Sequence, residues 1–92
     1  MTHRTEVSAE AFATCSKIKG AEVLLIQSIN HYLPVIRTAS RLDGETMLLR
    51  LVGQRGKPRK FSSLDTAANW MQEHGITMFR VEHEVLPGDN DQ

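Results

Sequence analysis

The residues best suited to bind a ligand lie in one short segment, residues 54–60, which we call the basic loop. Four of its seven positions are cationic: Arg55, Lys57, Arg59 and Lys60. Both residue types bind phosphate, and the planar fork of arginine also fits a guanine edge. The glycine and proline between them favour a turn. The loop therefore predicts contact with a DNA backbone, and the alternative is an ordinary solvated turn.

Residues on both sides of the basic loop could enlarge a cationic surface. Arg50 is expected on a strand, on the face opposite Leu49 and Leu51. Arg37 and Arg41 belong to the neighbouring strand and would join if the register permits. Ser62 or Ser63 begins a helix whose free N–H groups also favour anions. The predicted nucleic-acid-binding residues are Arg50, Arg55, Lys57, Arg59 and Lys60.

No set of residues has the spacing of a catalytic site. The chain has no glycine-rich phosphate-binding loop and no Gly-x-Ser-x-Gly turn, and its carboxylates are scattered. The segment 53–57 lacks the spacer and the hydroxyl residue of a phosphate-binding loop. Cys15 is the only cysteine, and nothing near it in sequence provides a base. We expect a packed thiol, no catalytic residue and a protein that is not an enzyme.

Metal and cofactor sites are not predicted either. The four histidines are not spaced as ligands, and one cysteine cannot form a zinc site. They are His3, His31, His74 and His83. His74 is explained by its position at a helix C-terminus, where a cation is favourable.

Trp70 is the single tryptophan and has two interpretations. At the margin of a helical stripe it would pack against the core edge or a dimer interface. Tryptophan is also common at binding hot spots, so Trp70 could instead anchor a partner.

The charges are segregated although the net charge is zero. Residues 37–60 carry seven basic and two acidic groups, whereas residues 61–92 carry one basic and six acidic groups. Such asymmetry indicates either a polyanionic partner or charge complementarity within the chain or between subunits.

Hydrophobic periodicity and turn residues predict the elements that position these groups. Ser8 begins a helix that ends at Gly20, and a serine at 62 or 63 begins a second that ends at Gly75. Residues 22–29 form a buried strand or a helix, because periodicity cannot separate the two in so short a run. Strands follow at 32–42, 46–53 and 76–85, the first two joined by Asp43-Gly44 as an antiparallel hairpin. Pro34 belongs at a strand start or a sheet edge.

The predicted fold is a two-layer α+β domain in the order α-β-β-β-α-β. A small, mostly antiparallel sheet carries a helix packed on one face, and the last strand can return parallel to a neighbour through a right-handed crossover. We expect a disordered N-terminus at 1–7, one domain at 8–86 and a disordered acidic tail at 87–92. A chain of 92 residues has a modest core, which favours a homodimer.

The composition indicates a cytoplasmic protein that does not enter a membrane. No run approaches the roughly 20 apolar residues of a membrane span, and no hydrophobic segment follows the polar N-terminus. A lone cysteine is typical of a reducing compartment.

Residues 46–84 resemble small accessory proteins of plasmid and mobile-element maintenance, the ParC-like partition proteins. The similarity lies in a basic turn, a Phe-Ser-Ser-Leu-Asp-Thr-Ala helix start at 61–67, and the Gly75-Ile76 break before the last strand. It implies a role in plasmid partition or its regulation and implies no catalytic residues.

The leading hypothesis is therefore a non-enzymatic, dimeric accessory protein of a bacterial mobile element that contacts DNA or a DNA-bound partner through the basic loop. The alternative is a protein-interaction module, such as an inhibitor or antitoxin-like component, that uses a sheet edge at Pro34 or the Trp70 face. A small enzyme based on Cys15 is the third class.

Overall fold

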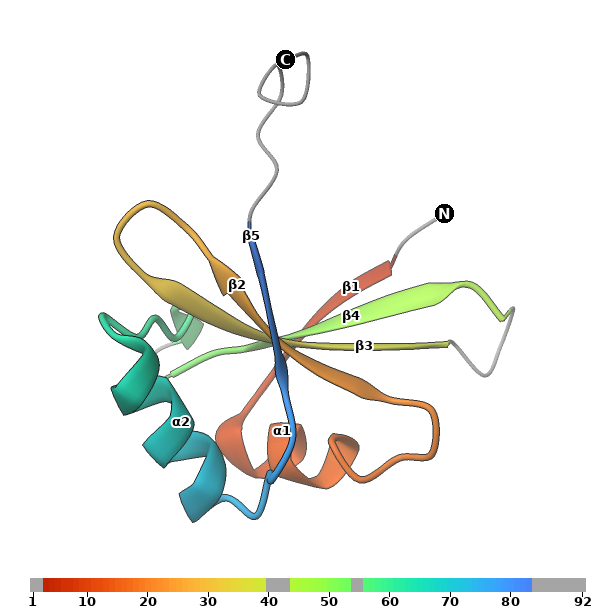
Figure 1. The fold of residues 1–92 in the computed structure, drawn as a ribbon. Helices are drawn as coiled ribbons and strands as arrows, with labels where there is room; N and C mark the ends of the chain where they lie inside the picture. The colour runs from red at the N-terminus through yellow and green to blue at the C-terminus, as the bar shows by residue number, and fades with distance from the viewer. Residues whose placement is uncertain (1–2, 40–43, 54–55, 84–92) are drawn as a thin grey trace.

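The computed structural model describes residues 3–39, 44–53 and 56–83. Within these ranges the chain forms a sheet with both helices below one face, while the other face carries no helix (Figure 1). In chain order the elements are β1 (His3–Val7), α1 (Ala9–Cys15), β2 (Glu22–Gln27), β3 (Tyr32–Ala39), β4 (Thr46–Leu51), α2 (Leu64–Glu73) and β5 (Arg80–His83).

The five strands are arranged in the order β1-β4-β3-β2-β5. β3 is antiparallel to both of its neighbours, whereas β1 is parallel to β4 and β5 is parallel to β2. The two-layer α+β class is confirmed, but the sheet is mixed rather than mostly antiparallel. The reason is that helices precede β2 and β5, and such crossover connections allow strands to return in the same direction.

Residues 3–7 were predicted to be disordered, and that prediction is wrong. They form β1, which pairs along β4 from His3 opposite Met47 to Val7 opposite Leu51. The Val52 N–H also donates to the Val7 carbonyl at 2.9 Å. An edge strand can be mostly polar, because the backbone ladder and the half-buried side chain of Val7 hold it in place.

The core lies between the sheet and the two helices. The alternation predicted for β4 is confirmed, since Leu49 and Leu51 are buried in this core. Cys15 is half-buried and packs against the same cluster, as expected for a structural thiol. The buried members of the cluster are Phe12, Val23, Leu25, Ile36, Leu49, Leu51, Phe61, Ala67, Met71 and Ile76.

Both helices begin at a serine, as predicted. Ser8 Oγ accepts a hydrogen bond from the Ala11 N–H at 3.3 Å, and Ser63 Oγ accepts one from the Thr66 N–H at 3.1 Å. The predicted end of α1 at Gly20 is wrong, because α1 stops at Cys15 and residues 16–20 form turns. There the Ser16 hydroxyl donates to the Ala13 carbonyl at 2.6 Å, so that carbonyl has a partner without further helix.

The C-terminus of α2 has the predicted glycine cap. Gly75 adopts a φ of 77°, which a residue with a side chain rarely tolerates. Its N–H donates to the Gln72 carbonyl at 3.1 Å, and the Ile76 N–H donates to the Met71 carbonyl at 2.9 Å. These two bonds are those of a Schellman motif, and they aim the chain from α2 towards β5.

The open choice for residues 22–29 is settled, because Glu22–Gln27 is the strand β2. Pro34 lies near the start of β3, one of the two sites predicted for it. β3 is central, however, so a sheet edge at Pro34 is excluded. Pairing with β4 begins only at Val35, which leaves Pro34 at a gap where its missing N–H breaks no ladder bond.

Two further predictions fall partly or wholly outside the described residues. Gly44 has a φ of 73°, in keeping with the predicted turn, whereas Asp43 lies outside the described residues. Residues 84–92, with the predicted tail, also lie outside them. Neither helix in the described ranges is long and apolar enough to cross a membrane.

Candidate nucleic-acid interface

The described part of the basic loop, residues 56–60, is held against the end of β4. The Gly53 N–H donates to the Lys57 carbonyl at 2.7 Å, and the Arg59 N–H donates to the Leu51 carbonyl at 3.0 Å. Residues 57–60 therefore return alongside the strand that they have just left. Gly56 has a φ of 71°, which permits the reversal.

Phe61 fixes the other end of the loop. Its backbone exchanges two hydrogen bonds with Tyr32, at 2.8 and 3.0 Å, and its ring is only 2 % exposed. The loop is therefore held between a strand end and a buried aromatic ring, so its side chains project from a fixed backbone.

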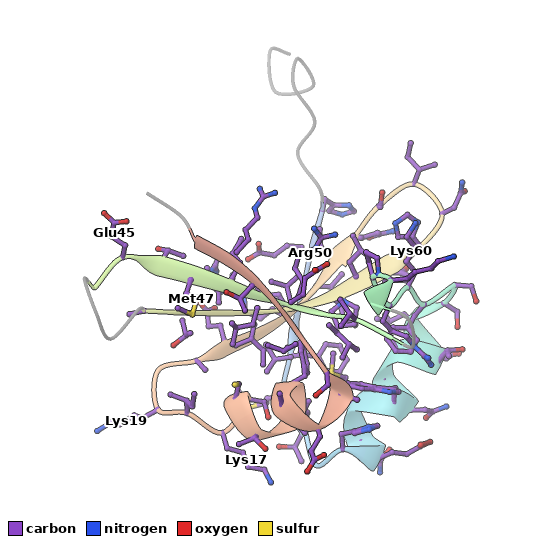
Figure 2. All side chains as sticks on the ribbon, turned by 180° about the vertical axis from the view of Figure 1, so that it is seen from behind. Lys17, Lys19, Glu45, Met47, Arg50 and Lys60 are labelled. Atoms are coloured by element: carbon purple, nitrogen blue, oxygen red, sulfur yellow. The ribbon has the colours of Figure 1, made fainter. Side chains whose placement is uncertain are left out.

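The cationic side chains leave this backbone in two directions. Phe61 faces the core, so the alternation of extended chain places Arg59 on the same side and Lys60 on the other. The Arg59 guanidinium lies 5.0 Å from the centre of the Phe61 ring. Figure 2 shows Lys60 with Arg50 on the side of the sheet away from the helices, whereas Lys17 and Lys19 lie beside α1.

The described cations of this region have no acidic partner. Lys57, Arg59 and Lys60 are exposed and Arg50 is half-buried, and no carboxylate in the described part of the chain lies within 4.0 Å of them. We call these four residues the basic surface, in which Arg50 and Lys60 lie on the helix-free side of the sheet and Arg59 lies on the helix side, over the Phe61 ring. Arg55, the fifth predicted binding residue, lies outside the described residues.

Arg37 was expected to extend this surface if the register allowed it. The register does place Arg37 on the same face as Arg50. Arg50 pairs with Val35, and Arg37 lies two residues after Val35 on β3, so its side chain points to the same side. Its charge is nevertheless balanced, because its guanidinium lies 3.1 Å from Glu22 and 3.5 Å from Glu82. Arg41 lies outside the described residues.

These contacts belong to a four-residue ion network, Glu22, Arg37, Arg80 and Glu82, on the helix-free face. Arg80 lies 2.8 Å from Glu22 and 3.8 Å from Glu82. Hydrogen bonds from Arg37 and then Arg80 lower the pKa of Glu22 below its ordinary value. Sequence analysis missed this network, because only the order β3-β2-β5 brings its members together. The alternation of Arg80 and Glu82 along β5 was the only local signal.

The start of α2 is less favourable to an anion than the sequence indicated. Ser63 Oγ already occupies the Thr66 N–H and lies 2.9 Å from Thr66 Oγ1. Asp65 adds a carboxylate to the first turn. A bound phosphate would meet this negative charge, so the basic surface does not gain from the helix start.

Trp70 is a half-buried residue at the core margin. Its ring centre lies 5.8 Å from that of Phe12 and 5.9 Å from that of Phe61, and it stacks on His74 at 4.0 Å. His74 Nδ1 lies 2.8 Å from the Trp70 carbonyl oxygen. Trp70 thus supports Phe61 and, through it, the basic loop, while its role at an interface remains a prediction.

No group of three or more histidine, cysteine or acidic side chains in the described ranges could hold a metal ion. In comparisons with known proteins, no family model and no curated protein matches this chain. The functional argument therefore depends on the geometry of the basic surface.

Proposed function

We propose that the protein is a non-enzymatic accessory protein that contacts DNA, or a partner bound to DNA, through the basic surface of Arg50, Lys57, Arg59 and Lys60. The observation that supports this most directly is the contrast between two groups of cations. Arg37 and Arg80 are paired with carboxylates of the ion network. The basic surface has no such partner among the described residues, so its positive charge is open to an external polyanion.

The surface is suited to the phosphate backbone rather than to bases. Lysine and arginine that neutralise phosphates release condensed counterions, which drives binding without regard to sequence. Base stacking would need exposed aromatic rings, but Phe61 is buried and Trp70 is half-buried against it. Duplex DNA is therefore a better ligand than a single strand.

The fixed backbone of the basic loop also favours binding. The protein's own backbone holds it, through the hydrogen bonds between Gly53 and Lys57 and between Arg59 and Leu51. Less conformational entropy is then lost when the side chains engage phosphates.

The resemblance to ParC-like proteins extends this proposal to a cellular role. We propose on this basis that the contact with DNA occurs in the cytoplasm of a bacterium that carries a plasmid or another mobile element, in partition or its regulation. The alternative of a protein-interaction module loses one of its two surfaces, because Pro34 is not on a sheet edge.

The test compares two double variants with the same change in charge. Lys57→Ala with Lys60→Ala removes two cations from the basic surface, and Lys17→Ala with Lys19→Ala removes two exposed lysines beside α1. Affinity for a fluorescent duplex is measured by anisotropy at several salt concentrations. We expect the first variant to reduce the magnitude of the slope of log K against log salt by about 2, because each phosphate contact contributes about 0.9.

The second variant should keep the parent slope and affinity. Equal losses in both variants would show that only overall charge matters. A parent protein whose binding does not change with salt would refute phosphate contact altogether.

A further inference from the structure

The outer edge of β5 combines an unpaired strand edge with exposed apolar side chains. β5 ends the sheet, and no described strand pairs with its outer side. Val81 is 42 % exposed there, and Met78, just before the strand, is 83 % exposed. Edge strands of monomeric proteins are commonly protected by charge, proline or bulges. β5 carries the charged residues Arg80 and Glu82, so it is the exposed apolar Val81 between them that indicates a partner.

The charges on β5 suit a partner with the same sequence. Arg80 and Glu82 flank Val81 and lie on the helix-free face, where both belong to the ion network. If a second β5 runs antiparallel with Val81 opposite its own copy, each Arg80 lies opposite a Glu82. Opposite charges at such cross-strand positions are favourable, and a two-fold axis creates both pairs at once.

We propose that two copies of this chain associate through their β5 edges, antiparallel and with the two-fold axis at Val81. The two five-stranded sheets then form one continuous sheet. The exposed Val81 side chains meet at the axis on the helix side, and the ion networks of both copies join on the other face. This inference does not depend on binding to DNA.

The ion network orients the Arg80 side chain of β5 before a second copy binds. The Arg80 guanidinium is held 2.8 Å from Glu22 and its side chain is still 65 % exposed. It is therefore oriented on the correct face and remains open to a second carboxylate. Little side-chain entropy is lost when Glu82 of the second copy approaches.

The other edge strand provides a natural control. β1 has the same alternation of charge, Arg4 and Glu6 around Thr5, and all three residues are exposed. β1 carries a polar residue where β5 carries Val81. Charge alone would allow pairing at either edge, whereas exposed apolar surface favours β5.

The test uses charge reversal and complementation. Arg80→Glu gives a chain with two acids around Val81, and Glu82→Arg gives a chain with two bases. Each variant alone should weaken the dimer about tenfold or more, because both cross-strand pairs become repulsive. An equimolar mixture should recover a heterodimer, in which every pair is again opposite in charge. Molar mass is measured by sedimentation and light scattering at micromolar concentrations, with circular dichroism as the check on folding.

Arg4→Glu is the matched control and should leave the dimer intact. Val81→Lys is a second variant that keeps the ion network and places two like charges at the axis, so it should be monomeric even if the reversals disturb folding. The proposal is overturned if the parent is monomeric, if the mixture does not associate, if Val81→Lys remains dimeric, or if Arg4→Glu dissociates the dimer.

Discussion

At Glu22, two arginines from different strands meet one carboxylate. Arg37 comes from β3 and Arg80 from β5, and both donate hydrogen bonds to it, at 3.1 and 2.8 Å. This arrangement explains how a chain with no net charge can present an uneven surface. One group of cations is paired with carboxylates of the chain, and the basic surface has no acidic partner among the described residues.

The lowered pKa of Glu22 makes the stability of the fold depend on pH. Because the pKa in the folded state lies below the ordinary value of 4.5, the ionised form stabilises the fold above that pH. The contribution is lost as the pH falls through the folded-state pKa. Glu22→Gln should therefore be less stable than the parent at neutral pH, and the difference should shrink below about pH 4.5.

Urea denaturation of both proteins across this pH range measures that difference. Glu73→Gln is the control, since Glu73 is exposed and forms no ion pair with the described residues. A gap between parent and Glu22→Gln that stays constant down to acidic pH would contradict the role assigned to Glu22.

Single residues differ in how far sequence reveals their role. The outward position of Arg50 follows from alternation with Leu49 and Leu51, and it was predicted. The pairing of Arg37 with Glu22 and Glu82 was not, since these residues are 15 or more positions apart in sequence and only strand order joins them. The cations of the basic surface lie close together in sequence and were predicted. The carboxylates that pair with Arg37 are distant in sequence, so their pairing was not.

At the scale of elements, the starts of both helices, the end of α2 and the antiparallel β3–β4 hairpin were predicted correctly, whereas the end of α1 and the pairing of β1 were not. The serine that begins α2 and the glycine that ends it act within one turn of the helix, so sequence shows them directly. β1 has only Val7 as a buried-facing apolar residue, and its stability comes from a parallel partner more than 40 residues away. No local pattern of residues 3–7 could have shown that pairing.

The two adjacent serines before α2 allow a direct test of the cap. Sequence left the choice between Ser62 and Ser63 open, and the hydrogen bond to the Thr66 N–H assigns the cap to Ser63. Ser63→Ala should reduce the free energy of unfolding by about 1 kcal/mol. Ser62→Ala should change it by less than about 0.5 kcal/mol, because Ser62 is exposed and makes no cap contact. Equal effects in chemical denaturation would contradict this assignment.

For the whole molecule, the order of strands determines which charged residues lie on the same face of the sheet. Both helices cover one face (Figure 1), and Arg50 and Lys60 lie on the other face (Figure 2), as does the ion network. A two-fold axis through β5 and perpendicular to the sheet keeps the helix-free faces of both copies on the same side. The dimer would then present Arg50 and Lys60 of both copies on one side, which joins the two proposals without making either depend on the other.

Association through β5 also has a consequence for stability. A dimer that unfolds to separate chains gains about 1.4 kcal/mol of stability per dimer for each tenfold rise in protein concentration. The denaturation midpoint of the parent and of Arg4→Glu should therefore rise with concentration, whereas that of the monomeric Val81→Lys variant should stay constant. Fluorescence of Trp70, which packs between Phe12 and Phe61, follows the transition in all three proteins. Over a hundredfold range of protein concentration the expected change in the free energy of unfolding is on the order of 3 kcal/mol per dimer. A parent midpoint that stays constant over this range would show that association through β5 does not stabilise the fold.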